Sequence, residues 1–208
     1  MAAESDDVDA ALQFIEETNL LIDEKVEQAV KNAAQLRSQY LEDIQKAEEK
    51  IALVSLIEEQ TRLTLELKQV QDDELKVEAL KAELVEVEKK IQEEKEEINR
   101  NLAIIEEILV VTGAKLSDEV DNVEELDKQL AALVSELGEN YDIHLPRTKQ
   151  YQQDLDTLIT DIFNETLYLS KTAIDAAAEV GIVAECSWVY VQFADRWAWI
   201  DPVRVVKM

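Results

Sequence analysis

Apolar residues recur at alternating spacings of three and four along the first part of the chain, a pattern that predicts long helices. No glycine or proline precedes Gly113. A first seam keeps heptad spacing over about four heptads, which is typical of a coiled coil. Its members are Val8, Leu12, Ile15, Asn19, Ile22, Val26, Ala29, Ala33, Leu36 and Tyr40. The further step from Tyr40 to Ile44 breaks the heptad phase, as a stutter does.

A second seam repeats every seven residues from Leu56 to Ile105, and its partner positions slip near its middle. Two arrangements fit this slip. The first is one very long helix with a change of phase, and the second is a turn at residues 71–74 that makes an antiparallel hairpin. A hairpin gives each helix an internal partner, whereas Asp72 and Asp73 are weak turn residues. The sequence leaves both arrangements open, and both predict an elongated particle.

The three glycines are expected to end helices. Gly113 follows an apolar run and suits the left-handed position after a helix. The next helix is expected to begin at Ser117 and to end at Gly138, and an asparagine and a proline predict a loop over residues 139–148. Gly181 ends the last helix, whose wide apolar face belongs in a bundle. The predicted helices span about residues 7–70, 75–112, 117–137 and 147–180.

After Gly181 the apolar period changes from that of a helix to two, which predicts strands. One strand is expected within Cys186–Phe193 and a second over Arg196–Ile200, with a short turn at Ala194-Asp195. Pairing Phe193 with Arg196 sets the register of this hairpin. That register places Tyr190 opposite Trp199, Gln192 opposite Trp197 and Val189 opposite Ile200.

Both faces of the predicted hairpin are apolar, and a lone hairpin is marginally stable in water, so the helices must cover at least one face. We expect that cover to come from helix residues 167–180. All three tryptophans lie in the tail, where they act either as a structural plug or as a docking surface. The candidate interaction surface consists of Trp188, Tyr190, Trp197 and Trp199.

The formal net charge of −26 disfavours binding to nucleic acid or to an anionic membrane surface and favours basic partners. A single cysteine, Cys186, excludes an internal disulfide and fits a reducing compartment. The first residues are acidic rather than apolar, and no apolar stretch is long enough to span a membrane. We therefore expect a soluble, cytoplasmic protein, with secretion by a non-classical route left open.

No set of residues indicates catalysis. His144 is the only histidine, is expected in a loop and lacks the neighbours that a metal site needs. Cys186 is expected to be inert, and the pairs Glu106-Glu107 and Glu124-Glu125 are not distinctive in so acidic a chain. Asn19 interrupts an apolar seam, where a buried asparagine can set register and oligomeric state, although an exposed end would also tolerate it.

These patterns predict a mainly α fold: an elongated helical bundle or coiled coil over residues 1–181, with a β-hairpin tail over 182–208 packed on its end. The expected function is a non-enzymatic scaffold or assembly subunit that binds a protein partner or itself and uses no cofactor or metal. The alternative is a membrane-active helical protein, such as a subunit of an α-helical pore-forming toxin, which is similar in overall architecture. Leakage of liposomes would separate the two.

Overall fold

The computed structural model describes residues 2–70, 73–116 and 122–207, with side chains from Asp6 onward. The fold is mainly α, as the sequence predicts. In the described ranges the helices are α1 (Ala2–Ala52), α2 (Val54–Gln69), α3 (Glu74–Lys115), α4 (Val123–Leu137) and α5 (Glu139–Glu179). The strands are β1 (Val183–Cys186), β2 (Val189–Phe193), β3 (Arg196–Ile200) and β4 (Val203–Lys207).

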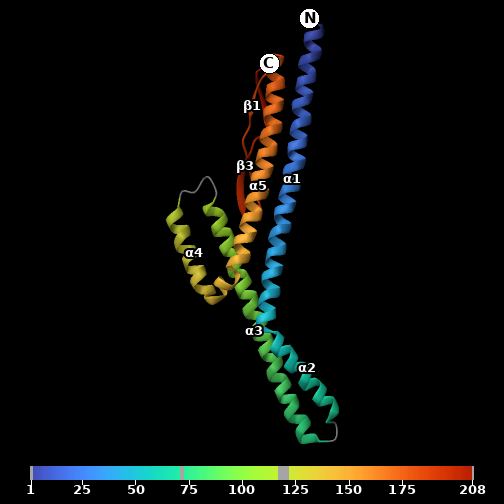
Figure 1. The fold of residues 1–208 in the computed structure, drawn as a ribbon, viewed down its shortest axis with the longest axis vertical. Helices are drawn as coiled ribbons and strands as arrows, with labels where there is room; N and C mark the ends of the chain where they lie inside the picture. Colours follow the sequence, from blue (N-terminus) through green and yellow to red (C-terminus); the bar gives the residue numbers. More distant parts are fainter. Residues whose placement is uncertain (1, 71–72, 117–121, 208) are drawn as a thin grey trace.

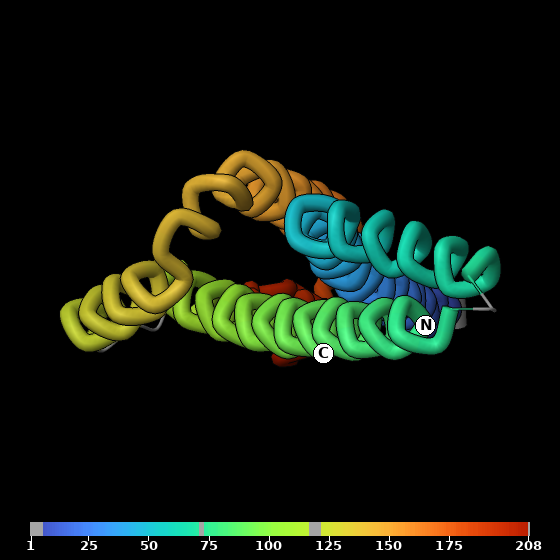
Figure 2. Tube along the Cα trace, turned by 90° about the horizontal axis from the view of Figure 1, so that it is seen from below, coloured from blue at the N-terminus to red at the C-terminus, as the bar shows by residue number. Residues whose placement is uncertain are grey.

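The molecule is elongated, and both chain ends lie at the same end of it (Figure 1). Helices α1 and α5 run side by side along its length, and α2 and the first half of α3 form an arm at the opposite end. Helix α1 alone has 51 residues and is therefore about 75 Å long. Seen from the arm, α1, α3 and α5 occupy separate corners and α4 extends to one side beside α3 (Figure 2).

The arm is an antiparallel hairpin of two helices, which is the second of the two arrangements that fit the slip in the second seam. Helices α2 and α3 pack along each other, so the continuous rod does not form. Residues 71 and 72 of the expected turn lie outside the described residues. Asp73 begins α3 by accepting a hydrogen bond from the backbone N–H of Lys76 at 3.2 Å. Leu63, Leu80 and Val87 belong to the apolar core of the arm.

The predicted helix over 7–70 is interrupted at Leu53, which no local breaker marks. The helical hydrogen bonds continue through this point, because the N–H of Leu53 donates to Glu49 and its C=O accepts from Ile57. Leu53 is 4% exposed and packs in the core of the arm with Leu63. The bend therefore follows from packing α2 against α3 rather than from backbone chemistry.

The expected loop over 139–148 is wrong, because α5 begins directly after Gly138. Pro146 lies inside this helix, where its ring removes one backbone hydrogen bond. Buried side chains in these first turns of α5 contact α1 and outweigh that cost. The expected start of the preceding helix at Ser117 falls in residues 117–121, outside the described residues.

Two of the three glycines end helices as predicted. Gly138 and Gly181 take positive φ angles of 59° and 82°, which a glycine adopts without strain. The expectation for Gly113 is wrong, because α3 continues through it to Lys115 and its φ is not positive. Gly113 is buried, and its role is to let another part of the backbone approach.

The tail forms two two-stranded antiparallel sheets, where the sequence predicted one hairpin. Strands β2 and β3 pair in the predicted register, with Tyr190 opposite Trp199 and Phe193 opposite Arg196. Strands β1 and β4 form the second sheet. The alternating Val-Arg-Val of β4 is a strand signal that the predicted tail omits, and Pro202 lies at the corner between β3 and β4.

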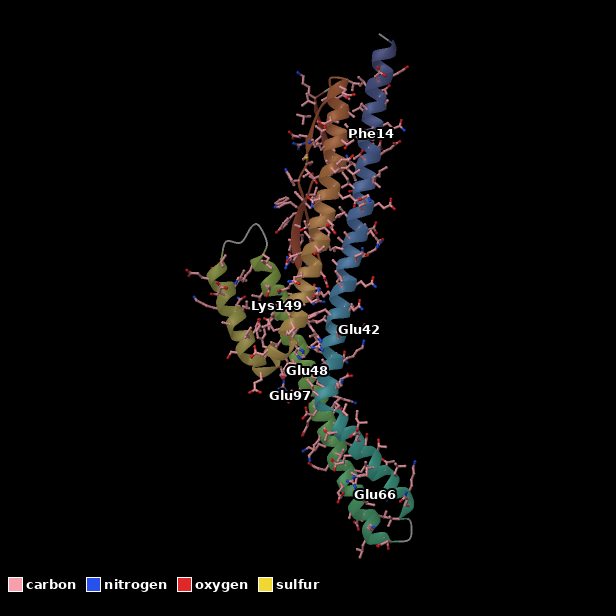
Figure 3. All side chains as sticks on the ribbon, viewed as in Figure 1. Phe14, Glu42, Glu48, Glu66, Glu97 and Lys149 are labelled. Carbon is pink, nitrogen blue, oxygen red and sulfur yellow. The ribbon has the colours of Figure 1, made fainter. Side chains whose placement is uncertain are left out.

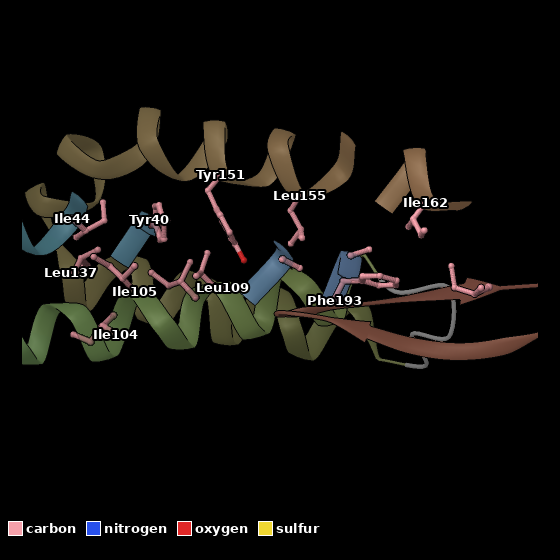
Figure 4. Packing of buried hydrophobic residues seen from close by; sticks show 14 of the residues in the cluster. Tyr40, Ile44, Ile104, Ile105, Leu109, Leu137, Tyr151, Leu155, Ile162 and Phe193 are labelled. Atoms are coloured by element: carbon pink, nitrogen blue, oxygen red, sulfur yellow. The ribbon is translucent and has the colours of Figure 1, made fainter. Parts of the chain in front are cut away.

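The β2–β3 hairpin of the tail continues along the molecule from the point where α3 ends. Strand β2 contacts α1, and β3 contacts α3 and α5, so the hairpin lies against all three helices. Figure 1 shows β3 beside α5, above the C-terminal end of α3. Ile22 and Ala33 of the heptad seam in α1 are almost fully inaccessible, as is Ile44 beyond the end of the seam. Figure 4 shows the shared core, in which Tyr151 and Leu155 of α5 meet Leu109 of α3 and Phe193 of the tail.

Candidate docking surface

The inner face of the β2–β3 hairpin is largely apolar and is covered by helices. Phe193 and Ile200 are 0% and 2% exposed, and Val191 and Ala198 pack against the same core. This cover comes from α1, α3 and α5 together, which is wider than the segment 167–180 expected from the sequence. Burial of an apolar side chain contributes about 1.5–3 kcal/mol, so this face supplies most of the attachment of the hairpin.

Buried polar contacts attach the tail to α5. Asp201 is fully buried, and its carboxylate accepts a hydrogen bond from Thr166 at 3.0 Å. One helical turn further on, the hydroxyl of Ser170 donates to the backbone C=O of Asp201. Burial raises the pKa of the Asp201 carboxyl, because a charged carboxylate is poorly solvated there.

The turn between β2 and β3 is held by two further contacts. Tyr151 donates a hydrogen bond to the carboxylate of Asp195, and Arg196 forms an ion pair with Asp156. Burial raises the pKa of Asp195, and burial together with the Asp195 hydrogen bond raises the pKa of Tyr151. Gly113 of α3 packs on the same turn. A Cβ at Gly113 would lie 1.9 Å from the backbone oxygen of Asp195.

Asn19 joins α1 to β4. Its amide nitrogen donates to the C=O of Val203 at 2.9 Å, and its amide oxygen accepts from the N–H of Val203 at 2.8 Å. The side chain thus binds the backbone as a neighbouring strand would. Both hydrogen bonds are made within one chain, which is sufficient to explain a polar residue in the apolar seam. Control of register or oligomeric state by Asn19 stays a prediction.

Replacing Asn19 with leucine should lower the free energy of unfolding by about 1–2 kcal/mol, because both polar groups of Val203 lose their partner. Urea denaturation measures this change. Asn32→Leu is a matched control, since the Asn32 amide bonds to Gln28 on the surface of α1. A more stable Asn19→Leu variant with a changed molecular mass would instead support the role in register.

The outer face of the hairpin carries the predicted aromatic residues. The Tyr190 ring stacks on Trp197 at a centroid distance of 5.1 Å and contacts Trp199 at 4.7 Å. Trp197 is 43% exposed, whereas Tyr190 and Trp199 are partly buried. Offset contacts of this kind hold aromatic rings in place.

Trp188 differs from the other three. It precedes β2, in the break between the two sheets, and is 52% exposed. Its ring stacks on Phe163 of α5 at 6.2 Å, so α5 rather than the hairpin positions it. We call Trp188, Tyr190, Trp197 and Trp199 the aromatic surface. Sequence reasoning grouped these four residues of the tail, of which Trp188 and Trp197 are exposed and Tyr190 and Trp199 are partly buried, but it missed the contribution of Phe163.

A buried polar cluster away from the tail was not predicted. His144 and Glu48 are 1% and 6% exposed, and the Nε2–H of His144 donates to the Glu48 carboxylate. Asn101 of α3 donates to the same carboxylate at 3.5 Å. Figure 3 labels Glu48 near the level where α1, α3 and α5 meet. The cluster joins three helices, and the Nδ1 atom of His144 has no hydrogen-bond partner in the protein.

Further residues on the face of α5 that carries His144 make polar and aromatic contacts toward the tail. Thr148 follows His144 by one turn, donates to the His144 backbone C=O at 3.1 Å and shares a hydrogen bond with Tyr40 at 2.8 Å. Tyr40 in turn stacks on Tyr151 at 4.9 Å. The spacing of His144, Thr148 and Tyr151 is the signal that could have found this face, had the segment been interpreted as helix.

The remaining candidates for chemistry lie apart from one another. Cys186 is half-buried, and burial raises the pKa of its thiol, which disfavours the reactive thiolate. The pairs Glu106-Glu107 and Glu124-Glu125 are exposed. Within residues 2–70, 73–116 and 122–207, no three histidine, cysteine or acidic side chains are grouped as a metal site requires.

Comparison with protein-family models, with curated proteins and with solved structures produced no match. No helix in the described part of the chain combines the length and the apolarity that crossing a membrane requires.

The buried Asp201 carboxyl predicts a pH effect on stability. Its pKa is raised on folding, so the native state keeps a proton that the unfolded chain releases. Stability from this group is full below the ordinary carboxyl pKa near 4 and is lost as pH rises through the raised value. Asp201→Asn keeps an oxygen for Thr166 and removes this loss. The variant should therefore gain stability relative to the wild type between pH 4 and pH 7 in urea denaturation.

The wild type and the Asp201→Asn variant both contain Asp195. Its raised pKa makes stability fall with pH in the same way in both proteins, so this contribution cancels in the difference between them. If the difference in the free energy of unfolding between the two proteins does not change with pH, Asp201 is charged in the native state at no cost in stability.

Proposed function

We propose that this chain is a non-enzymatic scaffold or assembly subunit that binds a protein partner through the aromatic surface. The observation that carries the proposal is the two-sided tail. Its inner face is attached to three helices by apolar burial and by polar contacts, while Trp188 and Trp197 remain 52% and 43% exposed on its outside. A tail that served only to close the helical bundle would need the inner face alone.

The contacts around the aromatic surface support a preorganised binding site. Tyr190 is stacked on Trp197, and Phe163 holds Trp188. Rings that are already ordered lose little conformational entropy on binding, and tryptophan and tyrosine dominate the energetic centres of protein interfaces. The long helical body supplies the spacing between such a site and the arm. The single cysteine supports a cytoplasmic setting for this role.

A selection from a random peptide library on the immobilised full chain tests the proposal. Peptides that bind the wild type should bind a Trp188→Ala/Trp197→Ala double variant at least about ten-fold more weakly, since the truncated side chains would be at the centre of the interface. Affinity is measured by surface plasmon resonance, and circular dichroism checks that the variant keeps its helices.

Tyr168→Ala is the matched control, because Tyr168 is an aromatic residue of α5 that is 71% exposed and lies outside the aromatic surface. The selected peptides should bind this variant as tightly as the wild type. Selected peptides that bind the double variant and the wild type equally well would contradict the proposal.

A further inference from the structure

We propose that the partner segment of the aromatic surface is rich in arginine, with guanidinium groups stacked on the exposed rings of Trp197 and Trp188. This inference rests on the proposed function and specifies the chemistry of the partner.

The charge of the molecule favours a cationic partner. The formal net charge is −26, and such a field attracts cations and repels phosphates and carboxylates. Two cations of the tail are already paired within the chain, since Arg196 binds Asp156 and Arg204 binds Glu185. An anion would have to compete with Asp156 or Glu185 for either of them.

The exposed rings suit a planar cation. The face of an indole ring attracts positive charge more strongly than the ring of tyrosine or phenylalanine does, and the guanidinium group both stacks on it and binds carboxylates. An ammonium group is more strongly hydrated and has no planar face to stack. For these reasons the aromatic surface should discriminate between arginine and lysine, which a diffuse acidic field would not do.

A groove of about 460 Å³ adjoins Trp197 and provides room for the aliphatic part of an arginine side chain. Val110 and Ala114 of α3 give it apolar walls, and Asp195 also lines it. The groove also contains Arg37, which is paired with Glu106 at 3.7 Å. Asp195 accepts one hydrogen bond from Tyr151, and a carboxylate has further acceptor positions for a guanidinium group.

Calorimetric titration of the full chain with three capped peptides tests the inference. The peptides are repeats of arginine and serine, of lysine and serine, and of citrulline and serine, the last being a neutral analogue of arginine with the same shape. At about 0.15 M salt, where diffuse attraction is screened, the arginine peptide should bind at least about three-fold more tightly than either of the others.

Variants locate the binding. Trp197→Leu keeps an apolar side chain without the aromatic ring and should weaken the arginine peptide about three-fold or more, whereas Tyr168→Leu should leave its affinity unchanged. Trp188→Leu is the second variant if Trp197→Leu does not fold. Equal affinity for the arginine and lysine peptides, or unchanged affinity in the folded tryptophan variants, would overturn the inference.

The outcome also separates this inference from the proposed function. If the library selection yields peptides that need Trp188 and Trp197 but carry no arginine, the docking function stands and the arginine chemistry is refuted. If no peptide requires those two residues, both are refuted.

Discussion

Replacing His144 with leucine will lower the free energy of unfolding by about 3–5 kcal/mol, because it leaves the carboxylate of Glu48 buried without its main partner. Glu48 is 6% exposed, and its other hydrogen bond, from Asn101, is 3.5 Å long. Water cannot replace the lost contact without opening the junction of α1, α3 and α5. Urea denaturation followed by circular dichroism measures the change.

A double variant, Glu48→Leu/His144→Leu, separates the loss of the pair from the loss of packing. Removing both polar partners leaves no unpaired charge, so the double variant should be more stable than His144→Leu alone. Additive losses in the two single variants and the double variant would show that the contact between the two side chains contributes nothing.

Gly113→Ala is the second substitution with a large expected effect. The added Cβ would meet the backbone oxygen of Asp195 at 1.9 Å, and neither α3 nor the β2–β3 turn can move without disturbing the core. We expect a loss of about 2–3 kcal/mol, which is in the range for overpacking. The turn carries Tyr151 and Arg196 contacts as well, so hydrogen exchange should also increase in β2 and β3.

The control for this test is the reverse substitution at an exposed position of the same helix, where helix propensity alone determines the effect. In an exposed helix position, alanine is more favourable than glycine by about 1 kcal/mol. Ala103 is exposed on the same helix, so Ala103→Gly should be destabilising by about that amount. If Gly113→Ala instead stabilised the protein, the close approach of the β2–β3 turn to α3 would be absent in solution.

The strand register of the hairpin could be predicted because its signals are local. Alternation along β2 and β3 and a short turn between them determine which residues face each other. The contacts that attach the tail are not local. Asn19 and Val203 are separated by 184 positions and Thr166 and Asp201 by 35, and no neighbouring residue marks either pair.

The errors have the same physical origin. Pro146 and Gly113 are breakers by their own chemistry, so the sequence predicts a loop around Pro146 and the end of a helix at Gly113. In the structure, α5 contains Pro146 because His144 and Thr148 are buried against neighbouring elements, and α3 contains Gly113 because the tail needs space there. Tertiary packing decided both positions against local preference. The concentration of all three tryptophans in one short segment, by contrast, is visible in the sequence itself.

Hydroxyl-radical footprinting of the folded chain tests most directly whether the tail has one attached and one exposed face. Trp188 and Trp197 should be oxidised rapidly, while Phe193 and Tyr151, which are 0% and 4% exposed, should be protected in the same sample. Rapid oxidation of Phe193, or protection of Trp197 in the isolated chain at low concentration, would contradict the two-sided tail and with it the docking surface.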